Sequence, residues 1–101
     1  MRHFEINFDF PVASSNLKIS LNATAEIHHS EPYFVVHDFY LANNKAENSL
    51  HSVLPAQEVI RINRDGSYQW VHKDSGQTSE LSIAIGKGIE SVLNKEELDK
   101  L

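Results

Sequence analysis

Apolar and polar residues alternate strictly in two stretches near the start of the chain, and this pattern leaves few folds open. From residue 17 to 27 every odd-numbered residue is apolar and every even-numbered residue is polar or charged. Side chains two apart share one face of a strand, whereas a helix would scatter them around its circumference. The same alternation runs through residues 4–10 and stops at Pro11. Both stretches therefore predict strands with one buried and one exposed face.

A third strand is predicted at residues 33–41, and it is apolar on both faces. Regular alternation puts Phe34, Val36 and Tyr40 on one side and Val35, Phe39 and Leu41 on the other. Such a strand is either central and covered on both sides, or it presents one face to another molecule. A second copy of the chain is the simplest partner of this kind. Val35 and Phe39 are therefore candidate binding residues.

Residues 58–72 predict a β-hairpin that turns at residues 63–66. The preferred register has a three-residue loop with Gly66 in the left-handed region, and it pairs Ile60 with Trp70. A two-residue loop would instead pair Arg61 with Trp70. Trp70 fits the core better than a binding platform, although it stays a candidate contact. Residues 50–54 fit one helical turn or a short strand, and the pattern does not decide between them.

The apolar period changes to three and four at residues 81–92, which predicts an amphipathic helix. Ser79 or Thr78 can cap its first turn. Gly88 lies on the apolar stripe, so close packing against the sheet can offset its low helix propensity. Asn94 with Glu97 three residues later predicts a helix stop and a new cap for a short helical tail at residues 95–101.

These elements predict one α+β domain spanning residues 1–101. Its antiparallel sheet has about five strands, a three-strand meander followed by the hairpin, and the C-terminal helix packs on it. A chain of 101 residues is long enough for one such domain and too short for two.

Composition excludes several functions. The chain has no cysteine, so it has neither disulfides nor thiolate chemistry. Its net charge is −5 and its Lys and Arg residues are scattered singly, so we expect no nucleic-acid partner. No apolar run approaches the ~20 residues that cross a bilayer, and the first ten residues lack the apolar core of a signal peptide. We therefore expect a cytoplasmic protein without a membrane partner.

The histidines near the second turn do not predict a metal site. His28 and His29 are adjacent, so in a strand they point to opposite faces. With a four-residue turn, His37 lies opposite Thr24, too far from His28 to share an ion at ~2.0–2.3 Å. Asp38 points away from His37. We expect no bound metal and no cofactor.

His72, Asp74 and Ser75 lie within four positions, which raises the hypothesis of a catalytic triad. Triads are normally assembled from distant segments around an oxyanion hole, and residues so close in a strand end and turn seldom reach that geometry. We expect instead that Asp74 or Ser75 hydrogen-bonds the local backbone. The hydroxyl-rich residues 74–82 could hold an anion at a helix N-terminus, but helix capping explains the same residues.

Two function hypotheses remain. The leading one is a small non-catalytic binding or interaction module that associates with itself, with another protein or with a small molecule. The alternative is a ligand-binding protein or enzyme with a pocket between helix and sheet, in which His37 or His72 is the polar group. A filled space between helix and sheet would count against the alternative. The candidate binding residues of the two hypotheses together are Val35, His37, Phe39, Trp70, His72 and Ser75.

Overall fold

A computed structural model describes residues 2–11, 18–28, 33–42 and 55–100. The strands are β1 (Arg2–Pro11), β2 (Lys18–His28), β3 (Tyr33–Leu41), β4 (Gln57–Arg64) and β5 (Ser67–His72), and the helices are α1 (Glu80–Val92) and α2 (Lys95–Asp99). Each strand pairs antiparallel with the next, so the sheet order is β1-β2-β3-β4-β5. The predicted α+β fold, with its meander, hairpin and C-terminal helix, is confirmed. Residues 50–54 lie outside the described residues.

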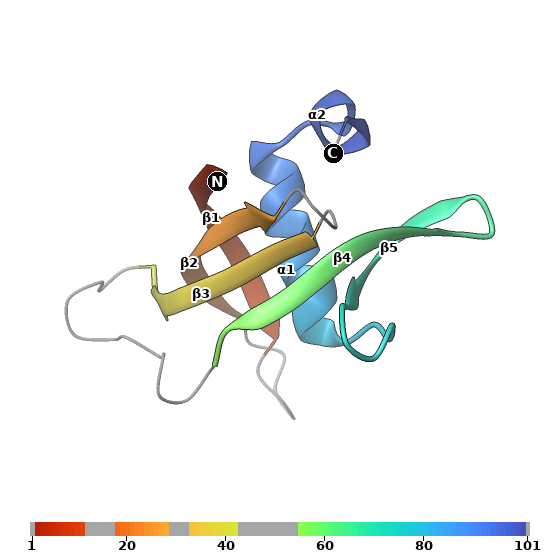
Figure 1. Cartoon of the computed structure of the whole chain (residues 1–101). Coiled ribbons are helices and arrows are strands. Elements are labelled where there is room, and N and C mark those ends of the chain that lie inside the picture. The colour runs from red at the N-terminus through yellow and green to blue at the C-terminus, as the bar shows by residue number, and fades with distance from the viewer. Residues whose placement is uncertain (1, 12–17, 29–32, 43–54, 101) are drawn as a thin grey trace.

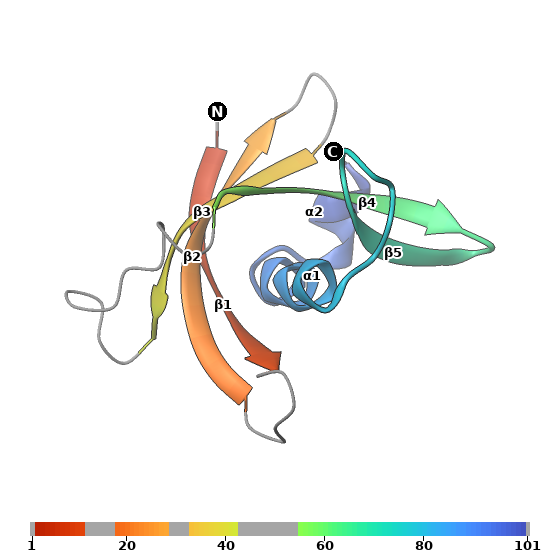
Figure 2. The same cartoon turned by 90° about the horizontal axis from the view of Figure 1, so that it is seen from below.

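The sheet is strongly curved, and α1 lies on its concave side (Figures 1 and 2). The apolar faces predicted for the first two strands point toward this side, which confirms their alternation. One core cluster joins the sheet to both helices. Its buried members are Ile6, Phe8, Leu21, Ala23, Ala25, Ile27, Phe34, Val36, Phe39, Val59, Trp70, Ala84, Ile85, Ile89, Leu93 and Leu98. The opposite, outward surface of the sheet is called the convex face below.

Two glycines let α1 approach the sheet closely at both of its edges. A Cβ atom on Gly86 would overlap the indole ring of Trp70 in β5. A Cβ atom on Gly88 would lie 3.0 Å from the carbonyl oxygen of Asn7 and 3.3 Å from the Cβ of Phe8, both in β1. The prediction that Gly88 packs closely against the sheet is therefore confirmed. Gly86 plays the same role on the β5 side.

Both predicted helix caps are present. Ser79 caps α1: its Oγ accepts a hydrogen bond from the N–H of Ser82, and the Oγ of Ser82 accepts one from the N–H of Ser79. Asn94 and Glu97 form the same reciprocal arrangement at the start of α2. These exchanges satisfy N–H groups that have no partner inside a helix. None of the helices among the described residues is long and apolar enough to span a membrane.

The faces predicted for β3 are wrong beyond His37, because the strand contains a β-bulge. Asn22 pairs with Tyr40 and Thr24 with His37, so two steps along β2 face three along β3. The extra residue is Asp38, whose φ of 56° lies in the left-handed region. The bulge exchanges the two faces, as one added residue must. Phe39 consequently points into the core, while Tyr40 turns to the convex face.

The preferred register of the β4–β5 hairpin is also wrong, and the alternative is the one observed. Arg61 pairs with Trp70, and Arg64 with Ser67, which leaves a two-residue loop of Asp65 and Gly66. Both loop residues have positive φ, 55° and 83°, as a type I′ turn requires. The twist of this turn matches that of the strands, and this match outweighs the apolar pairs of the longer loop.

Candidate functional site

Of the predicted binding residues on β3, Phe39 lies in the core, and Val35 and His37 lie on the convex face. The ring of Phe39 packs edge-on against Phe8, with their centroids 6.2 Å apart. Leu41 also packs against the core. The face on which a second copy was expected is therefore not the apolar surface that regular alternation implied. Only Val35 of that predicted set remains on the convex side, half-buried.

His37 lies between two carboxylates that do not converge on one point. It pairs with Thr24, as predicted. Its Nε2 is 3.3 Å from Glu26, and its Nδ1 is 2.9 Å from Asp38, so the prediction that Asp38 points away from His37 is wrong. The two carboxylates thus approach opposite sides of the imidazole ring. Within the described segments no three His, Cys, Asp or Glu side chains are placed to hold a metal ion, and His29 lies outside them.

His72 contacts the cap of α1, whereas Ser75 lies in the turn between β5 and α1. The Nε2 of His72 is 2.7 Å from the Oγ of Ser79, the α1 cap. The N–H of Gln77 donates to the Oγ of Ser75 at 3.2 Å, which confirms that Ser75 bonds its local backbone. The structure thus pairs His72 with the helix cap and places Ser75 in a turn of its own.

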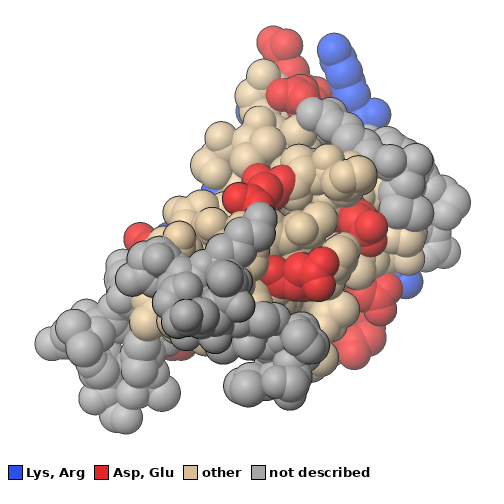
Figure 3. Space-filling model, turned by 90° about the vertical axis from the view of Figure 1, so that its left-hand side faces the viewer, with Lys and Arg blue, Asp and Glu red and all other residues tan. Residues whose placement is uncertain are grey.

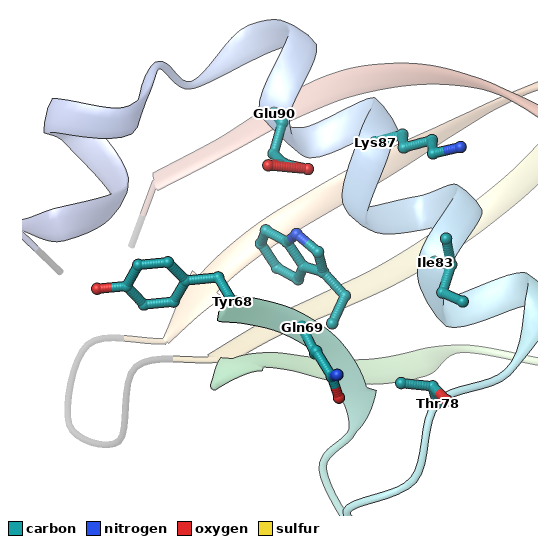
Figure 4. Close-up of a pocket in the computed structure, with 7 residues that line it drawn as sticks. Tyr68, Gln69, Thr78, Ile83, Lys87 and Glu90 are labelled. Carbon is teal, nitrogen blue, oxygen red and sulfur yellow. The ribbon is translucent and has the colours of Figure 1, made fainter. Parts of the chain in front are cut away.

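A hollow lies instead between β5 and α1, and sequence reasoning missed most of its residues. One pocket of about 340 Å³ is lined by Tyr68, Gln69, Trp70, Thr78, Ile83, Lys87 and Glu90 (Figure 4). A neighbouring pocket of about 280 Å³ shares Tyr68 and Glu90 and adds Arg61, Leu93, Lys95 and Leu98. The two adjoining pockets are together called the hairpin groove.

The hairpin groove has an apolar floor and exposed apolar walls. Trp70 is 6% exposed and contacts Phe34, with ring centroids 5.4 Å apart. Tyr68 and Ile83 are 49% and 45% exposed. With Val92 they are the exposed large apolar residues of the described part of the chain. In Figure 4, Tyr68 and Ile83 lie on opposite sides of the pocket, and Glu90 points from α1 toward β5.

Arg61 is the least solvated charged group of the groove. Its guanidinium carbon lies 3.6 Å from the centre of the Tyr68 ring, and one terminal nitrogen donates to Asp99 of α2 at 3.0 Å. Only 12% of the side chain is exposed. Its Nε is buried and has no hydrogen-bond partner. A buried N–H without a partner costs about 1–3 kcal/mol, so an acceptor that reached it would be favoured.

The outward side chains of β1–β3 and the lining of the hairpin groove differ in the sign of their charges. The described outward side chains of β1–β3 include Glu5, Asp9, Glu26 and Asp38 and no Lys or Arg, and Lys73, which follows β5, places its ammonium group 4.6 Å from the centre of the Tyr33 ring. Figure 3 views this side and shows acidic side chains set in uncharged surface, with basic ones at the margins. The hairpin groove carries three basic side chains against one acidic side chain, Glu90.

Polar side chains of the convex face bond mainly to one another. The hydroxyl of Tyr40 donates to Glu5 at 2.7 Å across β2. The amide of Asn7 donates to Asn22 at 2.7 Å and to Ser20 at 2.9 Å. These contacts hold β1, β2 and β3 together. Because these polar groups already have partners within the sheet, the hairpin groove is the better candidate for a binding site.

One sequence signal could have revealed the groove. Ile83 is apolar but falls outside the predicted apolar stripe of the helix, which is unusual for a residue with no core role.

Comparison of the chain with protein-family models, with curated proteins and with solved structures finds no match to any of them.

Proposed function

We propose that this chain is a small non-catalytic binding module, and that the hairpin groove is its ligand-contact surface. One observation carries the proposal: Tyr68 and Ile83, half-exposed and apolar, flank a concave surface floored by Trp70. Binding sites typically combine an apolar concave surface with a few polar groups, and aromatic residues contribute much of the binding energy. Here Lys87 and Glu90 supply the polar groups.

Three observations favour binding over catalysis. No hydrogen bond joins two side chains that line the groove, so its described residues contain no nucleophile held by a base. His37 and His72, the polar groups of the enzyme hypothesis, lie outside the groove. The space between α1 and the centre of the sheet is filled by Phe34, Ile85 and Ile89, all buried.

Trp70 is the single tryptophan of the chain and lines the groove, so it provides the test. The full chain, labelled with nitrogen-15, is titrated with pools of small organic fragments and short peptides. Amide shifts and tryptophan fluorescence are followed together. Ligands are expected to shift the resonances of residues 67–70 and 83–90 and to change the indole emission.

A matched pair of variants makes the test specific. Ile83→Glu puts a charge in the groove wall and should weaken binding at least about tenfold, the loss expected for one good apolar contact. Val92→Glu makes the same change at an equally exposed position of α1 that lines neither pocket, and it should leave binding unchanged. Shifts confined to the convex face, indifferent to Ile83→Glu, would move the binding site away from the groove and refute the proposal.

A further inference from the structure

β5 is an outer strand of the sheet, and part of its free edge is open. Strands joined by a two-residue turn exchange hydrogen bonds at Arg64–Ser67 and at every second pair beyond. The bond from the N–H of Lys73 to the carbonyl of Glu58, at 3.0 Å, continues this series. The backbone groups of Tyr68, Trp70 and His72 therefore point away from β4.

The chain itself closes one end of this edge. The N–H of His72 donates to Gln77 at 2.9 Å, and its carbonyl accepts from Gly76 at 2.8 Å. The carbonyl of Trp70 accepts from the hydroxyl of Ser82 at 3.0 Å. What remains is the N–H and carbonyl of Tyr68 and the N–H of Trp70. These three groups match the hydrogen-bonding pattern of one additional extended strand.

The larger pocket of the hairpin groove lies directly against this open edge. Tyr68 and Gln69 of β5 form one wall, Ile83, Lys87 and Glu90 of α1 form the other, and Trp70 is the floor. A strand added to β5 would direct alternate side chains toward the concave side, where the groove has its apolar floor. Backbone pairing and side-chain burial would therefore occur together.

The charges of the groove indicate the composition of that strand. The chain as a whole carries −5, whereas the groove lining has Arg61, Lys87 and Lys95 against Glu90. Asp99 satisfies one terminal nitrogen of Arg61 but leaves its buried Nε without a partner. A partner with carboxylates complements this surface, while a basic partner would be drawn to the acidic convex face.

We infer that the hairpin groove binds an extended, acidic peptide segment of a partner protein, which adds to β5 as a sixth strand. This inference rests on the proposed binding role of the groove. The segment pairs its backbone with Tyr68 and Trp70, inserts an apolar side chain between Tyr68 and Ile83, and directs a carboxylate toward Arg61 and Lys95.

Three synthetic probes test the inference on the full chain by fluorescence anisotropy. The first is a capped, labelled heptapeptide with glutamate at its second and sixth positions and valine at its fourth, which share one face of a strand, and threonine elsewhere. The second replaces each glutamate by lysine. The third keeps the acidic sequence but carries N-methyl groups on alternate amides, in both possible phases. The acidic probe should bind, the lysine probe should bind at least about tenfold more weakly, and one N-methyl phase should lose about tenfold. Binding of the acidic probe should also weaken as salt is raised.

Two pairs of variants locate the contacts. Tyr68→Pro removes the outward N–H at an edge position that tolerates proline, and Tyr68→Ala removes the same ring but keeps that N–H. Tyr68→Pro should therefore bind the acidic probe several-fold more weakly than Tyr68→Ala. Lys95→Glu should weaken binding, whereas Lys100→Glu, at a position that lines neither pocket, should not. Circular dichroism of each variant shows whether it is folded.

The possible outcomes separate the two proposals. Strand addition would be overturned if both N-methyl phases bound as tightly as the unmodified peptide. If Ile83→Glu still abolished that binding, the groove would remain the binding site. Equal or tighter binding of the lysine probe would overturn the acidic partner. Failure of all three probes, with fragments that still bind at Trp70, would overturn the peptide inference alone. Association of the chain with itself that Tyr68→Pro abolishes would replace the partner by a second copy.

Discussion

Gly86 of α1 lies directly over the indole of Trp70, with no room for a Cβ atom between helix and ring. This contact fixes the distance from α1 to β5 and so the width of the hairpin groove. On the other side of the helix, Gly88 does the same against β1. Residues that are poor helix formers thus determine how the helix sits between the two edges of the sheet.

Replacing Gly86 by alanine should destabilise the protein, although alanine is the better helix former. Helix propensity favours the change by about 1 kcal/mol, but overpacking against Trp70 costs about 1–3 kcal/mol. The difference between these effects is a fall of up to about 2 kcal/mol in the free energy of unfolding, measured in urea titrations. Lys87→Ala, at the exposed neighbouring position, should stay within about 0.5 kcal/mol. A more stable Gly86→Ala protein would show that the helix can move away from β5.

Ser82 connects the first turn of α1 to the edge of β5, and its loss should be costly. It is fully buried, donates to the carbonyl of Trp70 and accepts from the N–H of Ser79. Ser82→Ala leaves both groups without this partner and should cost about 1–3 kcal/mol in chemical denaturation. Ser91→Ala removes a hydroxyl that donates to Gly88 from an exposed position, where water can replace it. That variant should change stability by less than about 0.5 kcal/mol, and equal losses in the two would contradict the assigned role of Ser82.

Two-residue alternation was sufficient to predict β1 and β2, because one face of each strand packs against the core, with only Phe4, Phe10 and Ile19 at the strand ends partly buried. The same reasoning predicted the wrong face for Phe39, since it assumed that β3 has no extra residue. The signal was present: apolar positions are even-numbered at Phe34 and Val36 but odd-numbered at Phe39 and Leu41. The extra residue of the bulge, Asp38, lies between these two runs.

The candidate site was less predictable than the fold, because it is made by side chains that three-dimensional packing brings together. Arg61 and Tyr68 meet across the β4–β5 hairpin only in the register of the two-residue loop. Lys95 joins them because α2 folds back toward the hairpin, where Asp99 reaches Arg61. No spacing of residues in the sequence predicts these contacts. The apolar Ile83, outside the apolar stripe of the helix, was the one local indication of the groove.

The bulge in β3 should depend on which backbone conformations residue 38 can adopt. Asp38 has a φ of 56°, a conformation that Asp and Asn tolerate and β-branched residues do not. Asp38→Val should lower the free energy of unfolding by about 1–2 kcal/mol, measured in guanidinium titrations. Asp38→Asn keeps the backbone preference and should change it by less than about 0.5 kcal/mol. Were valine as well tolerated as asparagine, the strand would have to lose its bulge, and Phe39 could not stay in the core.

The β4–β5 turn should also tolerate only certain residue types, and this preference can be tested separately from side-chain packing. Gly66 has a φ of 83° and open space around it, so a methyl group there changes only the backbone preference. Gly66→Ala should cost about 1–2 kcal/mol, whereas Asp65→Asn should be close to neutral because asparagine suits the first turn position.

The register of the β4–β5 hairpin can be observed by nuclear magnetic resonance. Arg61 and Trp70 form a pair without mutual backbone hydrogen bonds, whose Cα atoms approach to about 4.5 Å, so their Hα protons should show a strong Overhauser effect. Such an effect between Ile60 and Trp70 would restore the longer loop and separate Arg61 from Tyr68, and the groove would then lose its guanidinium.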